Sequence, residues 1–354
     1  MRVSTSGAYT SGLSAMQRLQ AALDQTQRQI SSGRRILTPS DDPIAAARAV
    51  EIRESIGRLE QFDRNANVAN NQLAQEESAL GSVNDVLQRV RELALQANNA
   101  TQTTESRRLI AIEMRQNLDA LIQIANQKDG NGSYLFSGNL DSTQPVARIG
   151  TSFAYNGDQG QRFIQIGEGR QVADGDSGAT VFFNIKDGNG TFSASSANSN
   201  TGTGIITTTN VVDPTAWLGR SYTITFVDDT DYELYNSAGT LALTGALEPG
   251  GVIAFRGIEL SIDGQPQAGD EFVVSPSRFQ DVFSTVDQLA EVLETGSTDP
   301  ASQAAINNGI NAGLRNIDQA IGNILNVRTQ VGSRLAAIEN QVDSNGAFKL
   351  NYQD

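Results

Sequence analysis

Apolar residues recur every seven positions along the segment from residue 59 to residue 97. A second row runs three residues ahead of the first, so apolar positions alternate by three and four residues, which is typical of a coiled-coil seam. The two rows comprise Leu59, Ala66, Leu73, Leu80, Leu87 and Ala94, and Phe62, Ala69, Glu76, Val83, Val90 and Ala97. The spacing predicts one long helix from about Asp42 to Asn99.

Glu76 is the polar interruption in these rows. Two interpretations remain open. Glu76 could fix the register against a partner helix, as buried polar residues at seam positions do, or its carboxylate could reach solvent at the edge of a bundle. We favour the second interpretation from the sequence.

The C-terminal third carries a similar pattern. Its seam positions are Ile310, Leu314, Ile317, Ile321, Ile324, Arg328, Val331, Leu335, Ile338 and Val342. Two shorter amphipathic segments are marked by Ile110, Met114, Leu118, Leu121 and Ala125, and by Phe279, Val282, Val286, Leu289 and Leu293. Each stripe is too narrow to be buried all round, so the N-terminal and C-terminal helices are expected to pack side by side as one antiparallel bundle.

Between the helical regions the hydrophobic pattern alternates every second residue, as at 222–226 and 258–262, with turn signals between the runs. The predicted fold class is α+β: a long antiparallel, coiled-coil-like helical rod with a β-rich domain inserted at its tip. The Gly- and Ser-rich tract 187–204 is expected to be a mobile loop. The predicted domains are 1–42, an axial helix and connector; 43–136 with 276–343, the rod; 137–275, the β-rich insertion; and 344–354, a truncated tail.

A break in the helical pattern separates two of these segments. An apolar stripe formed by Leu13, Met16, Leu19, Leu23, Thr26 and Ile30 stops at Ser31, Ser32 and Gly33. Glycine there is expected to cap the helix, and either Asp41 or Asp42 to cap the next one, with Pro43 in its first turn. The connector residues are Ser31, Ser32, Gly33, Arg34, Pro39, Asp41, Asp42 and Pro43.

Charge and composition narrow the range of possible functions. The 354 residues carry a net charge of −14, and residues 141–275 hold 6 basic against 16 acidic side chains. Nucleic-acid binding is disfavoured, because phosphate contacts need an uncompensated basic patch. No apolar run is long enough for membrane insertion, and the start lacks the apolar region of a cleavable signal peptide.

The usual catalytic groups are scarce. The chain has no His and no Cys, and no phosphate-binding or nucleophile motif occurs, so we predict no enzyme activity and no cofactor. Two carboxylate clusters could offer oxygens to a hard cation: Asp174 with Asp176, and Asp228, Asp229, Asp231 and Glu233. Turn chemistry and solubility account for such residues more simply, and we predict no metal site.

Several segments resemble the flagellin family. The segment "ISSGRRILTPSDDPIAAARAV" at 30–50, the rod segment "VLQRVRELALQANNATQTTESR" at 86–107 and the segment "NVRTQVGSRLAAIENQVDSN" at 326–345 carry the likeness. The forms "TPSDDPIAA", "NGSYLFSGN" and "AGDEFVVSPS" resemble the hook-associated members of that family. The resemblance covers about 1–140 and 270–345 and leaves the acidic middle uncovered.

The resemblance implies a structural adaptor at the hook–filament junction of the bacterial flagellum. Its partners would be flagellin, another hook-associated protein, further copies of the chain and an export chaperone. It would be extracellular, exported by the flagellum-specific type III route without a cleavable signal peptide. Leu13, Met16, Leu19, Leu23 and Ile30 would belong to an axial assembly helix. The candidate subunit-interface residues are Leu87, Arg89, Val90, Arg91 and Glu92.

Three alternatives remain: filament flagellin itself, a type III secretion tip or translocator protein, and an enzyme inserted in the middle domain. Family members end in a further amphipathic helix that packs on the N-terminal one, and no such stripe follows Val342. We therefore expect a truncated C-terminus, and residues 1 to about 35 to be largely disordered in the isolated monomer. Removal of about residues 141–270 is expected to leave a soluble helical rod.

Overall fold

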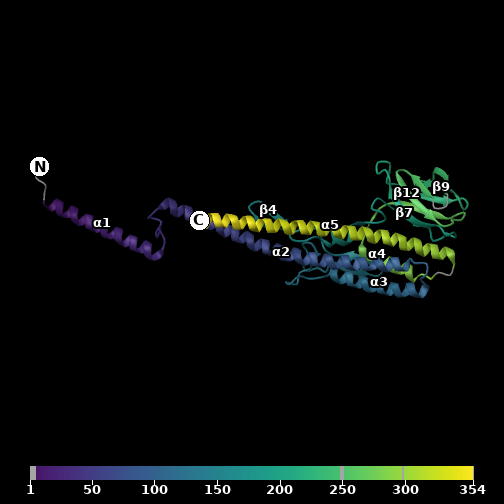
Figure 1. Cartoon of the computed structure of the whole chain (residues 1–354), viewed down its shortest axis with the longest axis horizontal. Coiled ribbons are helices and arrows are strands. Elements are labelled where there is room, and N and C mark those ends of the chain that lie inside the picture. Colours follow the sequence, from purple (N-terminus) through teal and green to yellow (C-terminus); the bar gives the residue numbers. More distant parts are fainter. Residues whose placement is uncertain (1–4, 248–250, 297–298, 354) are drawn as a thin grey trace. The chain divides into compact units, whose positions relative to one another are not determined.

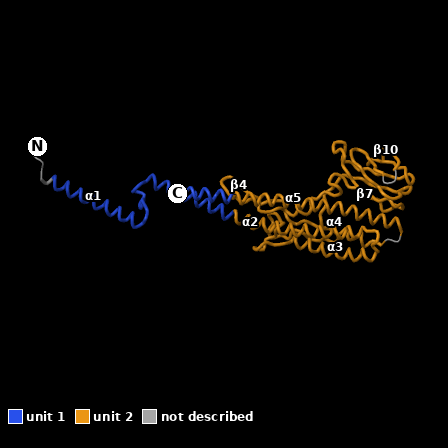
Figure 2. The backbone as a smooth tube through the Cα atoms, in the orientation of Figure 1, with its two compact units in different colours: residues 1–65, 341–354 blue, residues 66–340 orange. Residues whose placement is uncertain are grey.

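The computed structural model describes residues 5–247, 251–296 and 299–353 (Figure 1). The chain divides into two compact units, Met1–Asn65 with Gln341–Asp354, and Ala66–Asn340 (Figure 2). We call them unit 1 and unit 2. The helices are α1 (Thr5–Ser32), α2 (Pro43–Ala97), α3 (Thr104–Ala125), α4 (Val282–Glu294) and α5 (Pro300–Gln353). Both α2 and α5 pass from one unit into the other.

The predicted seam of α2 is buried in unit 2. Every seam position from Ala66 to Ala97 is at most 2% exposed, whereas Leu59 and Phe62, which lie in unit 1, are half-buried. In unit 2, α5 runs antiparallel to α2 (Figure 1). The polar pairs Glu77–Arg328, Arg91–Asp318 and Asn98–Asn311 follow this direction, since the position on α5 falls as that on α2 rises. The antiparallel helical arrangement is confirmed.

Helices α3 and α4 complete the bundle. The N-cap side chains of Thr103 and Asp281 accept hydrogen bonds from Ser106 N and Ser284 N, which satisfies free amides at the helix starts. Glycine allows α5 to approach α4 closely: a Cβ on Gly313 would lie 2.6 Å from Leu289 Cδ1. The apolar positions of α3 and α4 predicted from the sequence are buried, except Phe279, which is 67% exposed and lies before α4.

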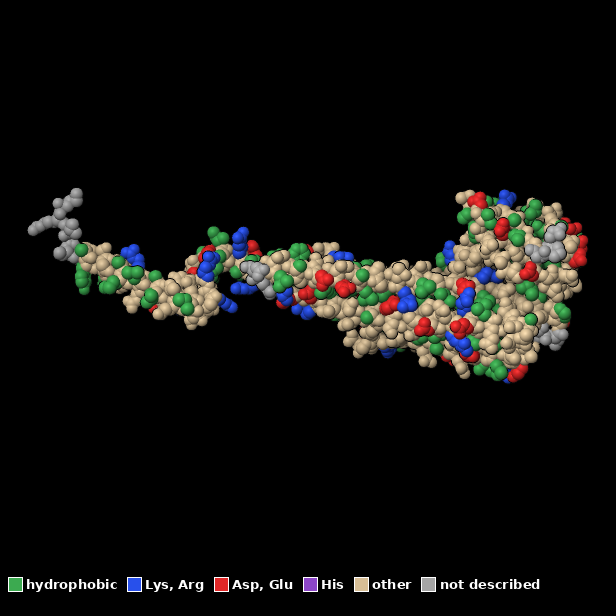
Figure 3. All heavy atoms as spheres, viewed as in Figure 1, with side chains coloured by type: hydrophobic (Ala, Val, Ile, Leu, Met, Phe, Trp, Pro, Cys, Tyr) green, Lys and Arg blue, Asp and Glu red, His purple; other side chains and the backbone are tan. Residues whose placement is uncertain are grey.

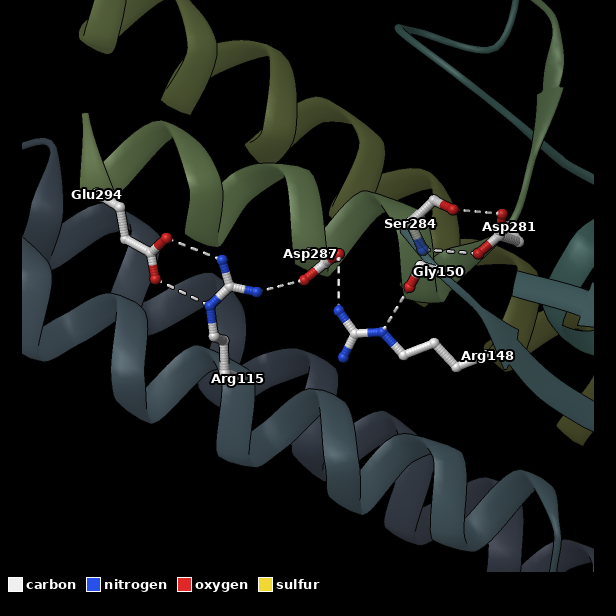
Figure 4. A network of polar contacts seen from close by, with 7 residues as sticks. All are labelled: Arg115, Arg148, Gly150, Asp281, Ser284, Asp287 and Glu294. Carbon is white, nitrogen blue, oxygen red and sulfur yellow. Dashed lines mark hydrogen bonds and ion pairs between the residues drawn. The ribbon is translucent and has the colours of Figure 1, made fainter. Parts of the chain in front are cut away.

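An ion-pair network crosses the outer side of this packing (Figure 4). Arg115 of α3 pairs with both Asp287 (2.6 Å) and Glu294 (2.9 Å) of α4. Arg148, from strand β1 (Val146–Ile149), pairs with the other oxygen of Asp287 at 3.4 Å. The carboxylate of Asp287 thus links α3, α4 and the start of the inserted region.

The inserted region has two structurally different parts. The first part contains β1 (Val146–Ile149), β2 (Ser152–Tyr155), β3 (Phe163–Gly167), β4 (Arg170–Ala173), the π-helix η1 (Ala179–Phe183) and β5 (Ile185–Lys186). Its strands form two-stranded antiparallel pairs, β1 with β2, β3 with β4, and β5 with β14 (Phe279–Gln280).

The first part shares a core with the helices. The ring of Phe283, on α4, lies 5.5–5.7 Å from the rings of Phe153, Phe182 and Phe183, and Phe182 also meets Phe136 at 5.1 Å. Phe136, Phe182 and Phe283 are fully buried. This part therefore belongs to the helical bundle.

The second part is a two-sheet domain with its own core, which we call the sheet domain. A five-stranded sheet has the order β10-β9-β8-β13-β6, and a three-stranded sheet the order β11-β12-β7, with every pairing antiparallel. The strands are β6 (Phe192–Ser196), β7 (Ile205–Val211), β8 (Tyr222–Phe226), β9 (Asp231–Asn236), β10 (Leu241–Ala246), β11 (Val252–Phe255), β12 (Ile258–Asp263) and β13 (Glu271–Pro276). Its core joins alternating residues of both sheets, including Phe192, Ile224, Leu260 and Phe272.

The prediction of a mobile loop at 187–204 is wrong. Residues 192–196 of this tract form β6, which pairs with β13 in the register Phe192↔Pro276 to Ser196↔Phe272. Phe192 is fully buried and Ala194 is 4% exposed, so two inward-facing side chains and a neighbouring strand are enough to fix this polar segment.

Candidate assembly surfaces and the seat of the sheet domain

Helix α1 exposes its apolar stripe. Within the described residues, Leu13, Met16, Leu19, Leu23 and Ile30 are 46–77% exposed. Apolar side chains lie at the surface along α1 in the space-filling view (Figure 3). A continuous exposed apolar stripe of this kind marks a surface that buries itself against another molecule or segment.

The connector 33–42 is held by local hydrogen bonds. Gly33 has φ +66°, the left-handed conformation that ends a helix. Asp41 Oδ2 accepts from Leu37 N and Thr38 N, and these backbone bonds lower the pKa of the Asp41 carboxyl. Asp42 accepts from Ala45 N, so Asp42 is the residue that caps α2, and Pro43 is the first helical residue. The connector is therefore shaped by its own side chains.

Further contacts tie the connector to α1. Gln25 donates to Asp41 Oδ1 (3.3 Å), and Gln29 donates to Arg35 O (2.7 Å). Ser32 Oγ accepts from Arg34 N, and the turn that contains Pro39 is closed by Asp41 N donating to Thr38 O. Ser31 lines an open groove beside these groups. The connector thus folds back on the end of α1.

The five candidate interface residues on α2 divide into two groups. Leu87 and Val90 are fully buried in the intramolecular seam, so assigning them to a subunit interface was wrong. They are core because they occupy seam positions. Arg89, Arg91 and Glu92 remain at the surface.

The surface candidates are engaged in ion pairs within the chain. Arg89 bridges Glu92 (3.1 Å) and Glu113 of α3 (2.7 Å), and Arg91 pairs with Asp318 of α5 at 2.6 Å. Their side chains are 42–66% exposed, so these pairs contribute little to stability and leave the groups accessible to another subunit.

Glu76 adopts neither of the two predicted roles. Its side chain is 2% exposed, and Oε1 accepts a hydrogen bond from Asp176 N in the inserted region. Burial raises the pKa of Glu76 well above its usual range, and the charge of Asp176 adds to the rise. Glu76 therefore anchors an inserted segment to α2: its hydrogen bond goes to that segment and not to the partner helix α5, and its side chain does not reach solvent.

The predicted carboxylate pair Asp174 and Asp176 surrounds Glu76 and is occupied by arginines. Arg162 lies 3.3 Å from Asp174, and Arg334 of α5 makes two contacts with Asp176 (2.8 and 3.0 Å). Burial raises the pKa of Asp174, although Arg162 opposes the rise. Among the described residues no group of three or more acidic side chains is arranged to hold a metal ion.

The second acidic cluster spans the turn between β8 and β9, with Asp228 and Asp229, and the first residues of β9, with Asp231 and Glu233. Asp228 accepts from Thr230 N and Asp231 N, and these bonds lower the pKa of its carboxyl. Glu233 accepts from the hydroxyl of Tyr235. Asp229 is exposed. The hydrogen bonds of Asp228 are those of a turn, and that of Glu233 joins two side chains within β9.

A row of polar residues on α5 holds the sheet domain through hydrogen bonds. This row was not recognised from the sequence. Asn308 donates to Gly204 O (2.8 Å) and accepts from Ile206 N (2.7 Å), and Asn311 donates to Ile206 O (3.0 Å). Asn316 accepts from Gly188 N, and Arg315 donates to Ala194 O. The signal was present, because asparagine is a poor residue for a helix interior and recurs here at helical spacing.

A buried arginine, Arg107, lies at the end of the bundle where α2 ends. Arg107 is 2% exposed and donates to Ala97 O, the last residue of α2, and to Gln303 of α5. Its cation lies at the negative end of the α2 dipole, which favours a positive charge. None of the described helices is long and apolar enough to cross a membrane.

Comparison with known proteins matches both the helical region and the sheet domain. Residues 3–141 match the bacterial flagellin N-terminal helical region. Residues 195–276 match the D2-like domain of flagellar hook-associated protein 1. The resemblance found in the sequence covered only about 1–140 and 270–345, so its range was too narrow.

Individual relatives agree. Flagellar hook-associated protein 3 of Salmonella typhimurium is 31% identical over 185 residues, which cover 52% of this chain and 58% of that protein. The crystal structure of flagellar hook-associated protein-3 from Legionella pneumophila has a TM-score of 0.82 and 32% identity, covering 85% of this chain and 96% of that one.

A second solved structure extends the match. The flagellar junction protein from Legionella pneumophila has a TM-score of 0.82 and 31% identity over 88% of this chain and 99% of its own. With this agreement in both sequence and fold, the chain belongs to the family of flagellar hook-associated protein 3, within the wider flagellin family.

Proposed function

We propose that this protein is a structural subunit of the bacterial flagellum, placed at the hook–filament junction. The observation that carries the proposal is the match to a flagellar junction protein over 99% of that chain. The exposed apolar stripe of α1 supports a role in assembly, because such a surface needs a partner. The absence of His and Cys from the sequence fits a structural role.

In this proposal the chain assembles with copies of itself, between another hook-associated protein and flagellin. Residues of the α1 stripe bury against neighbouring subunits, and the surface face of α2 around Arg91 contacts them laterally. The chain reaches the cell exterior through the flagellum-specific type III route without a cleaved signal peptide, accompanied by an export chaperone.

Gene deletion and localisation test this proposal together. A deletion strain is expected to form hooks but to lose its filaments, and the full gene to restore them. Immunogold labelling is expected at one position between hook and filament. Label along the whole filament would indicate filament flagellin instead, and intact filaments in the deletion strain would contradict the junction role.

Helix α1 is expected to be weakly protected from hydrogen exchange in dilute monomer. Its stripe is 46–77% exposed, and a helix without tertiary packing is marginal in water. The amides of residues 13–30 should exchange within seconds, whereas those of residues 73–94 should stay protected. Protection of 13–30 equal to that of 73–94 would contradict this prediction.

The double substitution Arg91→Ala with Glu92→Ala is expected to weaken the junction and leave the monomer folded. Exposed ion pairs contribute under about 1 kcal/mol each, so the monomer's free energy of unfolding should change little. Filament loss under shear measures the junction. The matched control is Arg108→Ala with Glu105→Ala, an exposed pair on α3. Shear resistance equal to wild type would remove this face of α2 from the interface.

A further inference from the structure

A small, partly open polar cavity of about 30 Å³ lies where the first inserted part meets α2. Glu76 and Gln72 of α2, Asp129 and Tyr134 of the segment after α3, and the inserted residues 160–162 and 174–176 line it. The cavity is large enough for a water molecule. The number of carboxylates around it exceeds the number of cations.

Within the described part of the chain, the ion pairs around this cavity leave Glu76 without a counterion of its own. Arg162 and Arg334 are committed to Asp174 and Asp176, and Arg334 holds both oxygens of Asp176. Gln161 also donates to Asp176 (2.6 Å), and the Gln72 amide, with its nitrogen toward Asp174, donates to that carboxylate at 2.7 Å. Among the described residues, the carboxylates of Glu76, Asp174, Asp176 and Asp129 therefore face two guanidinium groups.

The two oxygens of Glu76 differ in their surroundings. Oε1 accepts the Asp176 N–H at 3.1 Å, whereas Oε2 is buried and has no hydrogen-bond partner among the residues that the structure describes. A Cβ placed on Gly175 would lie 3.7 Å from Oε2 and 3.9 Å from the Leu135 carbonyl oxygen. A buried bare carboxylate oxygen is costly, whereas a protonated Oε2 can donate to a cavity water or a nearby carbonyl.

We propose that Glu76 is a proton-operated latch that holds residues 174–176 against α2 when it is neutral and loosens them when it ionises. The charged groups that face it are Asp174, Asp176 and Arg162 of the insertion, Arg334 of α5, and Asp129 after α3. Ionisation places a third negative charge beside Asp174 and Asp176. Opening of the 174–176 segment to water reduces the repulsion between these charges.

The sign of the pH dependence follows from the raised pKa of Glu76. Below the ordinary glutamic acid pKa, Glu76 is neutral in both the latched and the open state, so latching is strongest. As pH rises through and above that value, the open state ionises first and gains in population. Latching therefore weakens with rising pH, until Glu76 ionises in the latched state as well.

Hydrogen exchange of the amides of residues 174–181 tests the latch, with rates corrected for the intrinsic effect of pH. Between about pH 5 and about pH 8, the opening equilibrium of this segment in the wild-type protein should rise by about tenfold or more. The substitution Glu76→Gln keeps the acceptor for Asp176 N–H and cannot ionise, so its opening should rise clearly less over this range than that of the wild-type protein, and the buried Asp174, whose pKa is also raised, supplies the rise that remains. The control Glu77→Gln removes a carboxylate paired with Arg328 at 2.6 Å and should keep the wild-type pH response.

An identical pH response in wild type and Glu76→Gln would overturn the proposal. A direct measurement covers the case in which the variant folds poorly. Titration of the Glu76 side-chain carboxyl by NMR in the wild-type protein should show a midpoint above the ordinary glutamic acid value of about 4.3. A midpoint at or below the ordinary value would also overturn the proposal.

Discussion

Replacing Phe283 with alanine is expected to lower the free energy of unfolding of unit 2 by about 3–5 kcal/mol. Phe283 is fully buried, and its ring meets three phenylalanine rings of the inserted region at 5.5–5.7 Å. Its removal deletes the apolar contact area and leaves a cavity among rings that are fixed by separate elements. The loss should appear in urea unfolding followed by circular dichroism.

The neighbouring Phe279 provides the control for this prediction. Phe279 is 67% exposed, so Phe279→Ala should change the free energy of unfolding by less than about 0.5 kcal/mol. The conservative change Phe283→Leu should cost less than Phe283→Ala. If the free energy of unfolding of the Phe283→Ala protein lies within about 1 kcal/mol of the wild-type value, which is the size of one hydrogen bond, the aromatic cluster is not a shared core.

Two deletions of the inserted region are expected to have opposite outcomes. Strands β5 and β14 pair at Lys186↔Phe279, and Asp187 N donates to Arg278 O at 2.9 Å. Residues 188–277 can therefore be replaced by Asn-Gly, which closes a two-residue hairpin between Asp187 and Arg278. This deletion removes the sheet domain with its separate core and should leave a folded, cooperative helical bundle.

Deletion of residues 141–270 should instead fail to give a stable bundle. It removes Phe153, Phe182 and Phe183 from around Phe283, and it removes the partner of Glu76. We expect a loss of roughly 3 kcal/mol or more. Circular dichroism and thermal unfolding of the two deletion proteins decide the matter, and equal stability of both would contradict this division of the insertion. The expectation that this second deletion leaves a soluble rod is thus replaced.

The helical part of the fold could be predicted because one physical signal determines it. Apolar residues at seam spacing along α2 and α5 leave a narrow stripe that must be buried, and the stripe from Ala66 to Ala97 is buried as predicted. The same signal correctly separated the helices from the strands of the α+β fold. The same spacing placed Leu87 and Val90 in the seam, and only the family resemblance suggested that they belong to a subunit interface.

The contacts that attach the inserted region to the helices could not be predicted, because the residues in contact lie far apart in the sequence. Glu76 meets Asp176, and Phe283 meets Phe153 and Phe182, with no periodic pattern that links them. The strand β6 was missed because a polar segment needs only two inward side chains once a neighbour pairs with it. The asparagines of α5 were readable as residues poorly suited to a helix interior.

The attachment of the sheet domain to α5 has a consequence for how freely that domain can vary. Asn308 and Asn311 bind the peptide groups of residues 204 and 206, and Asn316 and Arg315 bind those of residues 188 and 194. These contacts go to backbone groups, so they do not depend directly on the side chains at the outer surface of the domain. Substitutions that change the charge or shape of the outer surface of the domain can therefore accumulate while its attachment to α5 stays constant. Helix α5 can in this way hold sheet domains that differ at their outer surface.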